Sequence, residues 1–270
     1  MQNKNFKLNF VLIFLIISFF SCNDFQKILN SKDASLKYKA AETYYNNGEY
    51  RRANRLLEQI TPSFRGKPQS ERIIFFFADS YLKTKNYYLA AYQFENFINS
   101  YPKSQKLEEA YFLEAKCYYF LSPQYSLDQD DTSTSLEKFQ IFINNYPNSK
   151  FSNEANILVS ELQTKLERKD YEISKQYYTI SDYKSALKSL DNFISSHPGT
   201  SYREGALYYK FLSAYEIAIN SITNKQKERL EELVILHANI IRYYPETIYS
   251  EDLKNIKKNI SNLLNNFKKT

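Results

Sequence analysis

The chain has 270 residues, of which 43% are hydrophobic and 17% aromatic, so it can bury a substantial core. Its formal net charge is only +6, from 36 basic and 30 acidic residues, which argues against nucleic acid as the main partner. With two cysteines and two histidines, the sequence offers no metal-ligand cluster at a recognised spacing.

Residues 1–21 have the layout of an export signal. Lys4 and Lys7 come first, Leu8 to Phe20 is apolar except for two residues, and Ser21 precedes Cys22. A helix over the apolar stretch reaches about 20 Å, against roughly 30 Å for the hydrocarbon core of a bilayer, so a permanent span is not expected. A cysteine directly after the small residue is typical of bacterial lipoproteins. We therefore predict cleavage before Cys22 and lipidation of its side chain; the alternative is an unlipidated secreted protein.

The predicted anchor defines the rest of the chain. Residues 22–33 form a lipidated tether, and residues 34–270 form the folded domain. Removal of residues 1–21 leaves an excess of four positive charges, which we attribute to a solvated surface. If Cys22 is acylated, Cys117 has no partner for a disulfide, so stability must come from packing. We expect no cofactor other than the covalent lipid on Cys22.

The folded domain reads as almost pure helix. It has few glycines, and period-2 alternation bounded by turn residues is absent apart from one Asn-Gly pair, Asn47-Gly48. Apolar residues spaced three and four apart and followed by proline recur along the chain. The copies are Phe94, Phe97, Ile98, Tyr101, Pro102; Phe139, Phe142, Ile143, Tyr146, Pro147; Leu190, Phe193, Ile194, His197, Pro198; and, more weakly, Ile240, Ile241, Tyr244, Pro245. Each copy is the second helix of a hairpin.

Small and aromatic residues upstream complete the pattern of a tetratricopeptide repeat. The second unit shows Ala78, Tyr81, Tyr87, Ala90, Phe94, Phe97 and Pro102 at the offsets of that repeat. We predict an all-α fold, a superhelix of about five tetratricopeptide-like hairpins without a sharp internal boundary, closed by a capping helix over residues 254–270.

The proline spacing exceeds the usual repeat length, so some helices or turns carry extra residues. We interpret Ser122–Thr134, with Asp128, Asp130 and Asp131, as an inserted acidic loop. A calcium loop is disfavoured, because the glycine turn and the terminal glutamate of such a loop are missing.

No catalytic motif stands out, since a Gly-rich phosphate loop, G-x-S-x-G, paired histidines and a Cys-His arrangement are all missing. We predict a non-enzyme that binds peptides along the first helices of its hairpins. The repeat register gives the groove candidates, which combine aromatic and charged side chains: Tyr38, Glu42, Tyr45, Arg72, Phe75, Asp79, Lys83, Phe112, Lys116, Tyr119 and Phe120. Replacing Phe75 and Phe112 is expected to weaken peptide binding without unfolding. The competing interpretation is that such rings pack between helices.

Several segments carry a resemblance to a known family. The runs Cys22–Ser31, Tyr44–Ala53 and Ser122–Gln129, together with Ala90–Phe94, Phe97-Ile98 and Tyr101-Pro102, resemble the BamD family of outer-membrane β-barrel assembly lipoproteins, in particular its Bacteroidota branch. The resemblance implies a five-repeat lipoprotein on the periplasmic face of the outer membrane. Its amino-terminal half would receive the aromatic-ended carboxy-terminal segment of an unfolded barrel protein, and its carboxy-terminal half would dock the periplasmic domains of BamA. His237, where a large apolar residue is usual, departs from the pattern.

Two rival functions share the anchor and the repeats. A periplasmic tetratricopeptide-repeat adaptor for peptidoglycan enzymes would differ in its partner, and copurification with BamA would discriminate. A glycan-binding outer-membrane lipoprotein is disfavoured, because such proteins usually place tryptophans against sugars and this chain contains no Trp.

Overall fold

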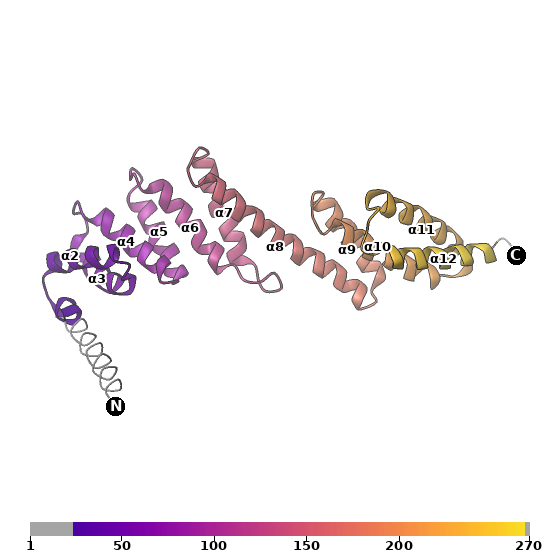
Figure 1. Cartoon of the computed structure of the whole chain (residues 1–270), viewed down its shortest axis with the longest axis horizontal. Coiled ribbons are helices and arrows are strands. Elements are labelled where there is room, and N and C mark those ends of the chain that lie inside the picture. Colours follow the sequence, from indigo (N-terminus) through magenta and orange to yellow (C-terminus); the bar gives the residue numbers. More distant parts are fainter. Residues whose placement is uncertain (1–23, 268–270) are drawn as a thin grey trace, which may run out of the picture. The chain divides into compact units, whose positions relative to one another are not determined.

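The computed structural model describes residues 24–267, and this part of the chain is helical throughout, with no strand. The predicted signal and the lipidation site at Cys22 lie outside the described residues. After a short helical segment over residues 24–30 come the helices α2 (Ala34–Asn46), α3 (Tyr50–Phe64), α4 (Ser70–Lys83), α5 (Tyr87–Ser100), α6 (Leu107–Leu121), α7 (Asp130–Asn145), α8 (Ser152–Thr179), α9 (Tyr183–Ser196), α10 (Arg203–Ile219), α11 (Thr223–Tyr243) and α12 (Ser250–Asn266) (Figure 1). None of the described helices is long and apolar enough to cross a bilayer.

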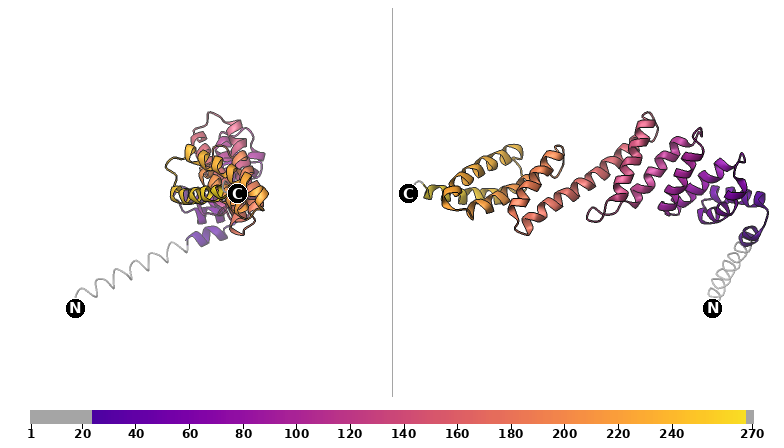
Figure 2. Two further views of the ribbon diagram at one scale, coloured as in Figure 1. Left: turned by 90° about the vertical axis from the view of Figure 1, so that its right-hand side faces the viewer. Right: turned by 180° about the vertical axis from the view of Figure 1, so that it is seen from behind.

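The helices form the predicted hairpins, so the all-α, tetratricopeptide-like fold class is confirmed. In chain order α2 packs on α3, α3 on α4, and so on to α7 (Figure 2). The small residues expected at the helix crossings, Ala78 and Ala90, are fully buried, and Phe94 and Phe97 are buried beside them. Fully burying an aromatic ring stabilises the fold by about 1.5–3 kcal/mol, so these stripes account for much of the packing.

The prolines end the hairpins as expected. The residue before each proline leaves the helix with φ near −130° and ψ between 60° and 72°, because a proline disfavours the helical region for its predecessor. The side-chain hydroxyl of the residue two positions after each proline accepts a hydrogen bond. The donor is the backbone N–H two residues further on, directly before the next helix begins. These hydroxyls belong to Ser104, Ser149, Thr200 and Thr247. The repeated signature is therefore x-Pro-x-Ser/Thr.

The turns inside three hairpins also share one backbone conformation. A left-handed residue, Gly48, Lys85 or Ser181, follows the first helix with φ of 78°, 64° and 63°. In the first hairpin the N–H of Glu49 then reaches back to the carbonyl of Tyr44 at 2.8 Å. This is the Schellman ending, in which a left-handed residue satisfies the last carbonyls of a helix.

The chain divides into two compact units, in contrast to the prediction of no sharp internal boundary. Among the described residues, unit 1 comprises 24–123 and 129–159, and unit 2 comprises 124–128 and 160–267. Helix α8 supplies residues to both. It has 28 residues, and this length explains the longest proline spacing, between Pro147 and Pro198. In unit 2 its second half packs on α9, where the Tyr171 and Phe193 rings lie 5.8 Å apart.

Two predicted segments differ in the structure. The acidic loop is shorter than expected, because Asp130 and Asp131 form the first turn of α7, where carboxylates favour the positive end of the helix dipole. The expected tether is partly folded. Phe25 and Leu29 are 7% and 6% exposed in the core of the first hairpin, and the Phe25 ring meets Tyr44 edge-on at 5.5 Å.

The capping helix is confirmed, although it begins at Ser250 rather than at Lys254. Leu253 and Ile260 are buried, and Phe267 packs against the same cluster. His237, which departs from the repeat pattern, is 7% exposed, and its ring lies 6.0 Å from Phe211. Burial lowers the pKa of His237, and the charge of Lys257 adds to this effect, so the imidazole serves as a neutral core residue.

One glycine of unit 2 is required by close packing. A Cβ on Gly205 would lie 2.5 Å from the hydroxyl oxygen and 3.1 Å from Cζ of Tyr171, a ring that is 7% exposed. Gly205→Ala is expected to lower the free energy of unfolding by about 1–2 kcal/mol, despite the better helix propensity of alanine. Urea unfolding followed by circular dichroism measures the effect. Gly199→Ala is the matched control, because nothing lies within 4 Å of that Cβ; an equal loss in both variants would contradict the packing argument.

Candidate functional site

The first helices of unit 1 carry the predicted groove residues, and an ionic network joins α2 to α4. The Tyr38 hydroxyl donates to Glu42 Oε1 at 2.9 Å, and Arg72 Nη1 lies 2.8 Å from the same oxygen. Burial and the hydrogen bond to Glu42 raise the pKa of Tyr38. These three candidates therefore lie together.

A second contact between the same helices is buried. The Tyr45 hydroxyl donates to Asp79 Oδ2 at 2.6 Å, and Asp79 is only 5% exposed. Burial is the main cause, and this hydrogen bond the second, of a pKa of Tyr45 far above its ordinary value. A buried carboxylate without a donor costs about 1–3 kcal/mol, so this bond fixes the spacing of α2 and α4. Because Asp79 is buried and already bonded, it is not available to a ligand.

Phe75 and Phe112 are not groove residues. They are 5% and 2% exposed. Phe75 packs edge-on against Phe94 and Phe97, and the Phe112 ring stacks on Phe151 at 4.7 Å. The competing interpretation, that rings pack between helices, is correct for these two side chains.

Phe76, the neighbouring ring, is absent from the predicted groove residues. Phe76 is half-buried, it stacks on Tyr45 at 3.9 Å, and the Arg72 guanidinium lies 4.9 Å from its centroid. The sequence does not separate the two rings. Phe76 lies four residues after Arg72 and three before Asp79, Phe75 lies three after and four before, and both spacings fit one helical face.

The predicted groove residues at the end of α6, Lys116, Tyr119 and Phe120, also contact one another. Lys116 Nζ pairs with Glu154 at 2.6 Å and lies 6.0 Å from the centroid of Phe120. Phe120 is 43% exposed, stacks on Tyr87 at 4.8 Å and meets Tyr119 edge-on. Phe120 is therefore an accessible ring.

Lys83 lines a basic hollow of about 620 Å³ at the turns of the first two hairpins. Arg51, Arg52 and Lys85 line it too, and Glu49, paired with Arg52 at 2.5 Å, is the acid among them. Tyr50 is also part of its wall. The hollow therefore suits an anionic group.

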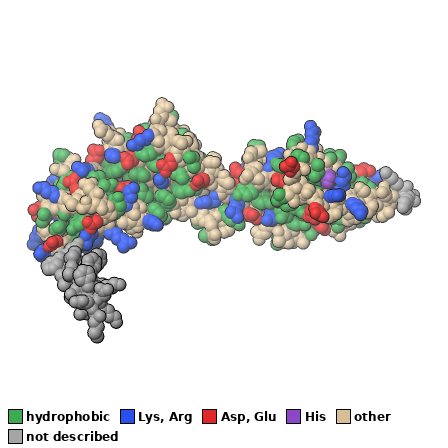
Figure 3. All heavy atoms as spheres, viewed as in Figure 1, with side chains coloured by type: hydrophobic (Ala, Val, Ile, Leu, Met, Phe, Trp, Pro, Cys, Tyr) green, Lys and Arg blue, Asp and Glu red, His purple; other side chains and the backbone are tan. Residues whose placement is uncertain are grey.

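Aromatic rings lead from α4 to this hollow. Phe76 stacks on Tyr45, and Tyr45 meets Tyr50 edge-on at 5.6 Å. The space-filling view shows broad hydrophobic areas on unit 1, with basic and acidic side chains among them (Figure 3). Rings next to cations can bind an apolar peptide side chain and an adjacent carboxylate.

The described residues include no group of three or more His, Cys, Asp or Glu side chains placed to hold a metal ion. Cys117 is free and fully buried, and burial raises the pKa of its thiol. A thiol held in its neutral form is a poor nucleophile, so Cys117 acts as a small core residue.

The profile of a family described as "YfiO: Outer membrane lipoprotein" matches residues 30–180 and 175–267. Comparison with curated proteins gives no match. Among solved structures, the crystal structure of MamA protein is 13% identical, with a TM-score of 0.32, over 79% of this chain and 92% of that one. The TPR2AB-domain:pHSP90-complex of yeast Sti1 is also 13% identical, with a TM-score of 0.41, over 84% and 98%.

Proposed function

The chain belongs to the YfiO family of outer membrane lipoproteins, and on this basis we propose that it is a subunit of the β-barrel assembly machinery. Its lipid anchor is Cys22, and it faces the periplasm. Unit 1 binds unfolded outer-membrane β-barrel proteins, and unit 2 docks the periplasmic domains of BamA. It is a scaffold rather than an enzyme.

The observation that carries the substrate role is the row of rings that ends at the basic hollow. Phe76, Tyr45 and Tyr50 lead to a hollow lined by Arg51 and Lys83. An aromatic residue at the end of a polypeptide offers an apolar ring and a free carboxylate on one residue. Charge-assisted hydrogen bonds to a carboxylate are about twice as strong as neutral ones, so the hollow favours a chain end over an internal segment.

The cellular role is tested by depletion of this protein followed by quantitation of outer-membrane β-barrel proteins. The proposal expects barrel levels to fall and BamA to copurify with the protein. Unchanged barrel levels would refute the role in assembly.

The substrate site is tested with a synthetic peptide that ends in phenylalanine with a free carboxylate. Arg51→Gln combined with Lys83→Gln is expected to weaken its affinity about tenfold, or roughly 1.4 kcal/mol, because both cations line the hollow and both are exposed. Isothermal titration calorimetry gives the affinity.

The matched control is Arg65→Gln with Lys39→Gln, which removes two exposed cations of unit 1 outside the hollow. The control variant should bind as the unaltered protein does. Amidation of the peptide end should reproduce the loss caused by the double variant. Equal binding of the free and the amidated peptide would contradict this assignment.

A further inference from the structure

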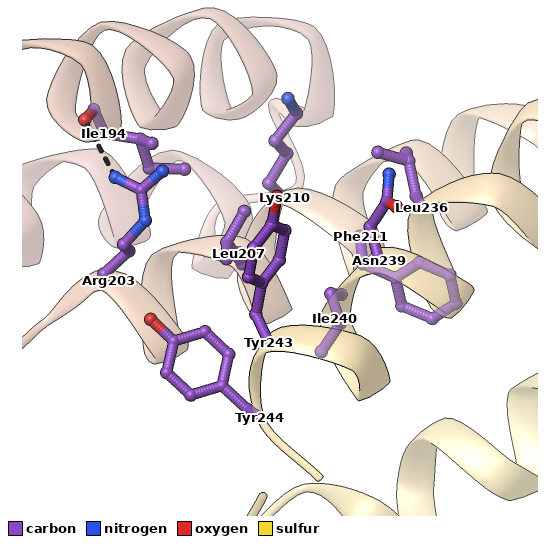
Figure 4. A pocket seen from close by; sticks show the side chains of 10 residues that line it. All are labelled: Ile194, Arg203, Leu207, Lys210, Phe211, Leu236, Asn239, Ile240, Tyr243 and Tyr244. Carbon is purple, nitrogen blue, oxygen red and sulfur yellow. Dashed lines mark hydrogen bonds between the residues drawn. The ribbon is translucent and has the colours of Figure 1, made fainter. Parts of the chain in front are cut away.

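Unit 2 contains a pocket of about 480 Å³ between the end of α9 and helices α10 and α11 (Figure 4). Its deepest side chains are apolar: Phe211 and Ile240 are 1% and 3% exposed, and the partly buried Leu207 and Leu236 complete the walls. The volume lies in the range of about 300–1,000 Å³ typical of ligand sites. All lining residues belong to unit 2, so this pocket is separate from the hollow of unit 1.

Two cations stand at the rim. Arg203 donates from Nη1 to the carbonyl of Ile194 at 3.3 Å, and among the described residues it forms no ion pair. A guanidinium has five N–H donors, so most of its capacity remains for a ligand. Lys210 pairs with Asp191, whose side chain is 54% exposed. The pocket therefore has an apolar floor and, at its rim, the positive charge of Arg203, which no acidic side chain of the described residues neutralises.

Polar and aromatic side chains complete the rim. Arg203 and Tyr244 lie on one side, and Asn239 and Leu236 on the other, with Tyr243 between them (Figure 4). Tyr243 is 69% exposed, so its ring is available to cover a ligand. The Asn239 amide offers both donors and an acceptor, which match a peptide group, whereas an acyl chain uses neither.

We propose that this pocket binds a protein segment in which an aromatic or leucine side chain is flanked by an internal aspartate or glutamate. The apolar side chain fills the space above Phe211 and Ile240. The carboxylate pairs with Arg203, and the segment's backbone bonds to Asn239. This site differs from the hollow of unit 1 in requiring no free chain end, and it stands independently of the role in barrel assembly.

The test uses a synthetic hexapeptide with Leu-Phe between two aspartates, acetylated and amidated at its ends, titrated into the purified full chain by calorimetry. Arg203→Gln is expected to weaken binding about tenfold, as loss of a charge-assisted bond implies. Tyr243→Ala is expected to weaken it about threefold. Neither substitution touches the buried floor, and thermal unfolding by circular dichroism verifies that both variants remain folded.

The control Arg242→Gln removes an exposed arginine at the end of α11, next to Tyr243, that does not line the pocket. This variant should bind the hexapeptide like the unaltered chain. A peptide with asparagine in place of both aspartates should bind about tenfold less tightly. The proposal is overturned if the unaltered chain does not bind the hexapeptide, if Arg203→Gln and Arg242→Gln weaken it equally, or if only dodecanoate competes for the site and the peptide does not.

Discussion

Replacing Phe112 with alanine should lower the free energy of unfolding by about 3–5 kcal/mol. The ring is 2% exposed and contacts Phe139, Phe142 and Phe151 at centroid distances between 4.7 and 6.1 Å. Its removal leaves a cavity where α6, α7 and the start of α8 meet, and a packed interior relaxes only partly around such a space. Urea unfolding followed by circular dichroism at 222 nm gives the value.

Phe120→Ala is the matched control, because the same atoms are removed from a ring of the same helix that is 43% exposed. Its expected cost is below about 1 kcal/mol. Two equal losses would mean that Phe112 does not carry the core of this hairpin. The comparison also separates stability from binding: the double replacement of Phe75 and Phe112 is expected to disrupt unit 1 and cannot report on a groove.

Lys138→Met should destabilise the protein by about 3–5 kcal/mol, because it leaves a buried carboxylate without its partner. Lys138 Nζ lies 2.6 Å from Glu114 Oε1, and the Glu114 side chain is 3% exposed. Burial raises the pKa of Glu114, although the ammonium opposes this rise. Burial alone would lower the pKa of Lys138, but the hydrogen bond to Glu114 and its charge raise it. The Lys138 ammonium thus offsets part of the cost of burying the Glu114 carboxylate.

The control Lys27→Met breaks an ion pair with Asp24 in which both side chains are at least 70% exposed. Exposed pairs contribute about 0–1 kcal/mol, so this variant should unfold close to the unaltered protein. Adding Glu114→Leu to Lys138→Met should restore much of the stability, because an apolar pair needs no counter-charge. If Lys138→Met alone cost no more than Lys27→Met, the buried pair would not be important for stability.

The hairpin repeat, and the point at which each proline-ended second helix stops, could be predicted from the sequence alone. Apolar residues at spacings of three and four fixed the buried face of each second helix, and proline after Tyr101, Tyr146, His197 and Tyr244 fixed where it stops. These are local effects, since a helical face and a proline constraint depend only on residues within one or two turns. The capping helix followed from the same reasoning, with its start misplaced by four residues.

Which side chains are available for binding depends on how the helices pack, and this could not be predicted from the sequence. Phe75 and Phe76 are adjacent in sequence, yet the first is core because it packs against the rings of α5, and the second is half-buried beside Tyr45 of α2. The contact between Glu114 and Lys138, the basic hollow and the pocket at Arg203 each join residues from different helices. The periodicity of a sequence indicates which residues share a helical face. Whether that face is buried depends on how the packed helices are rotated and how closely they approach, and both depend on the fit of many side chains at once.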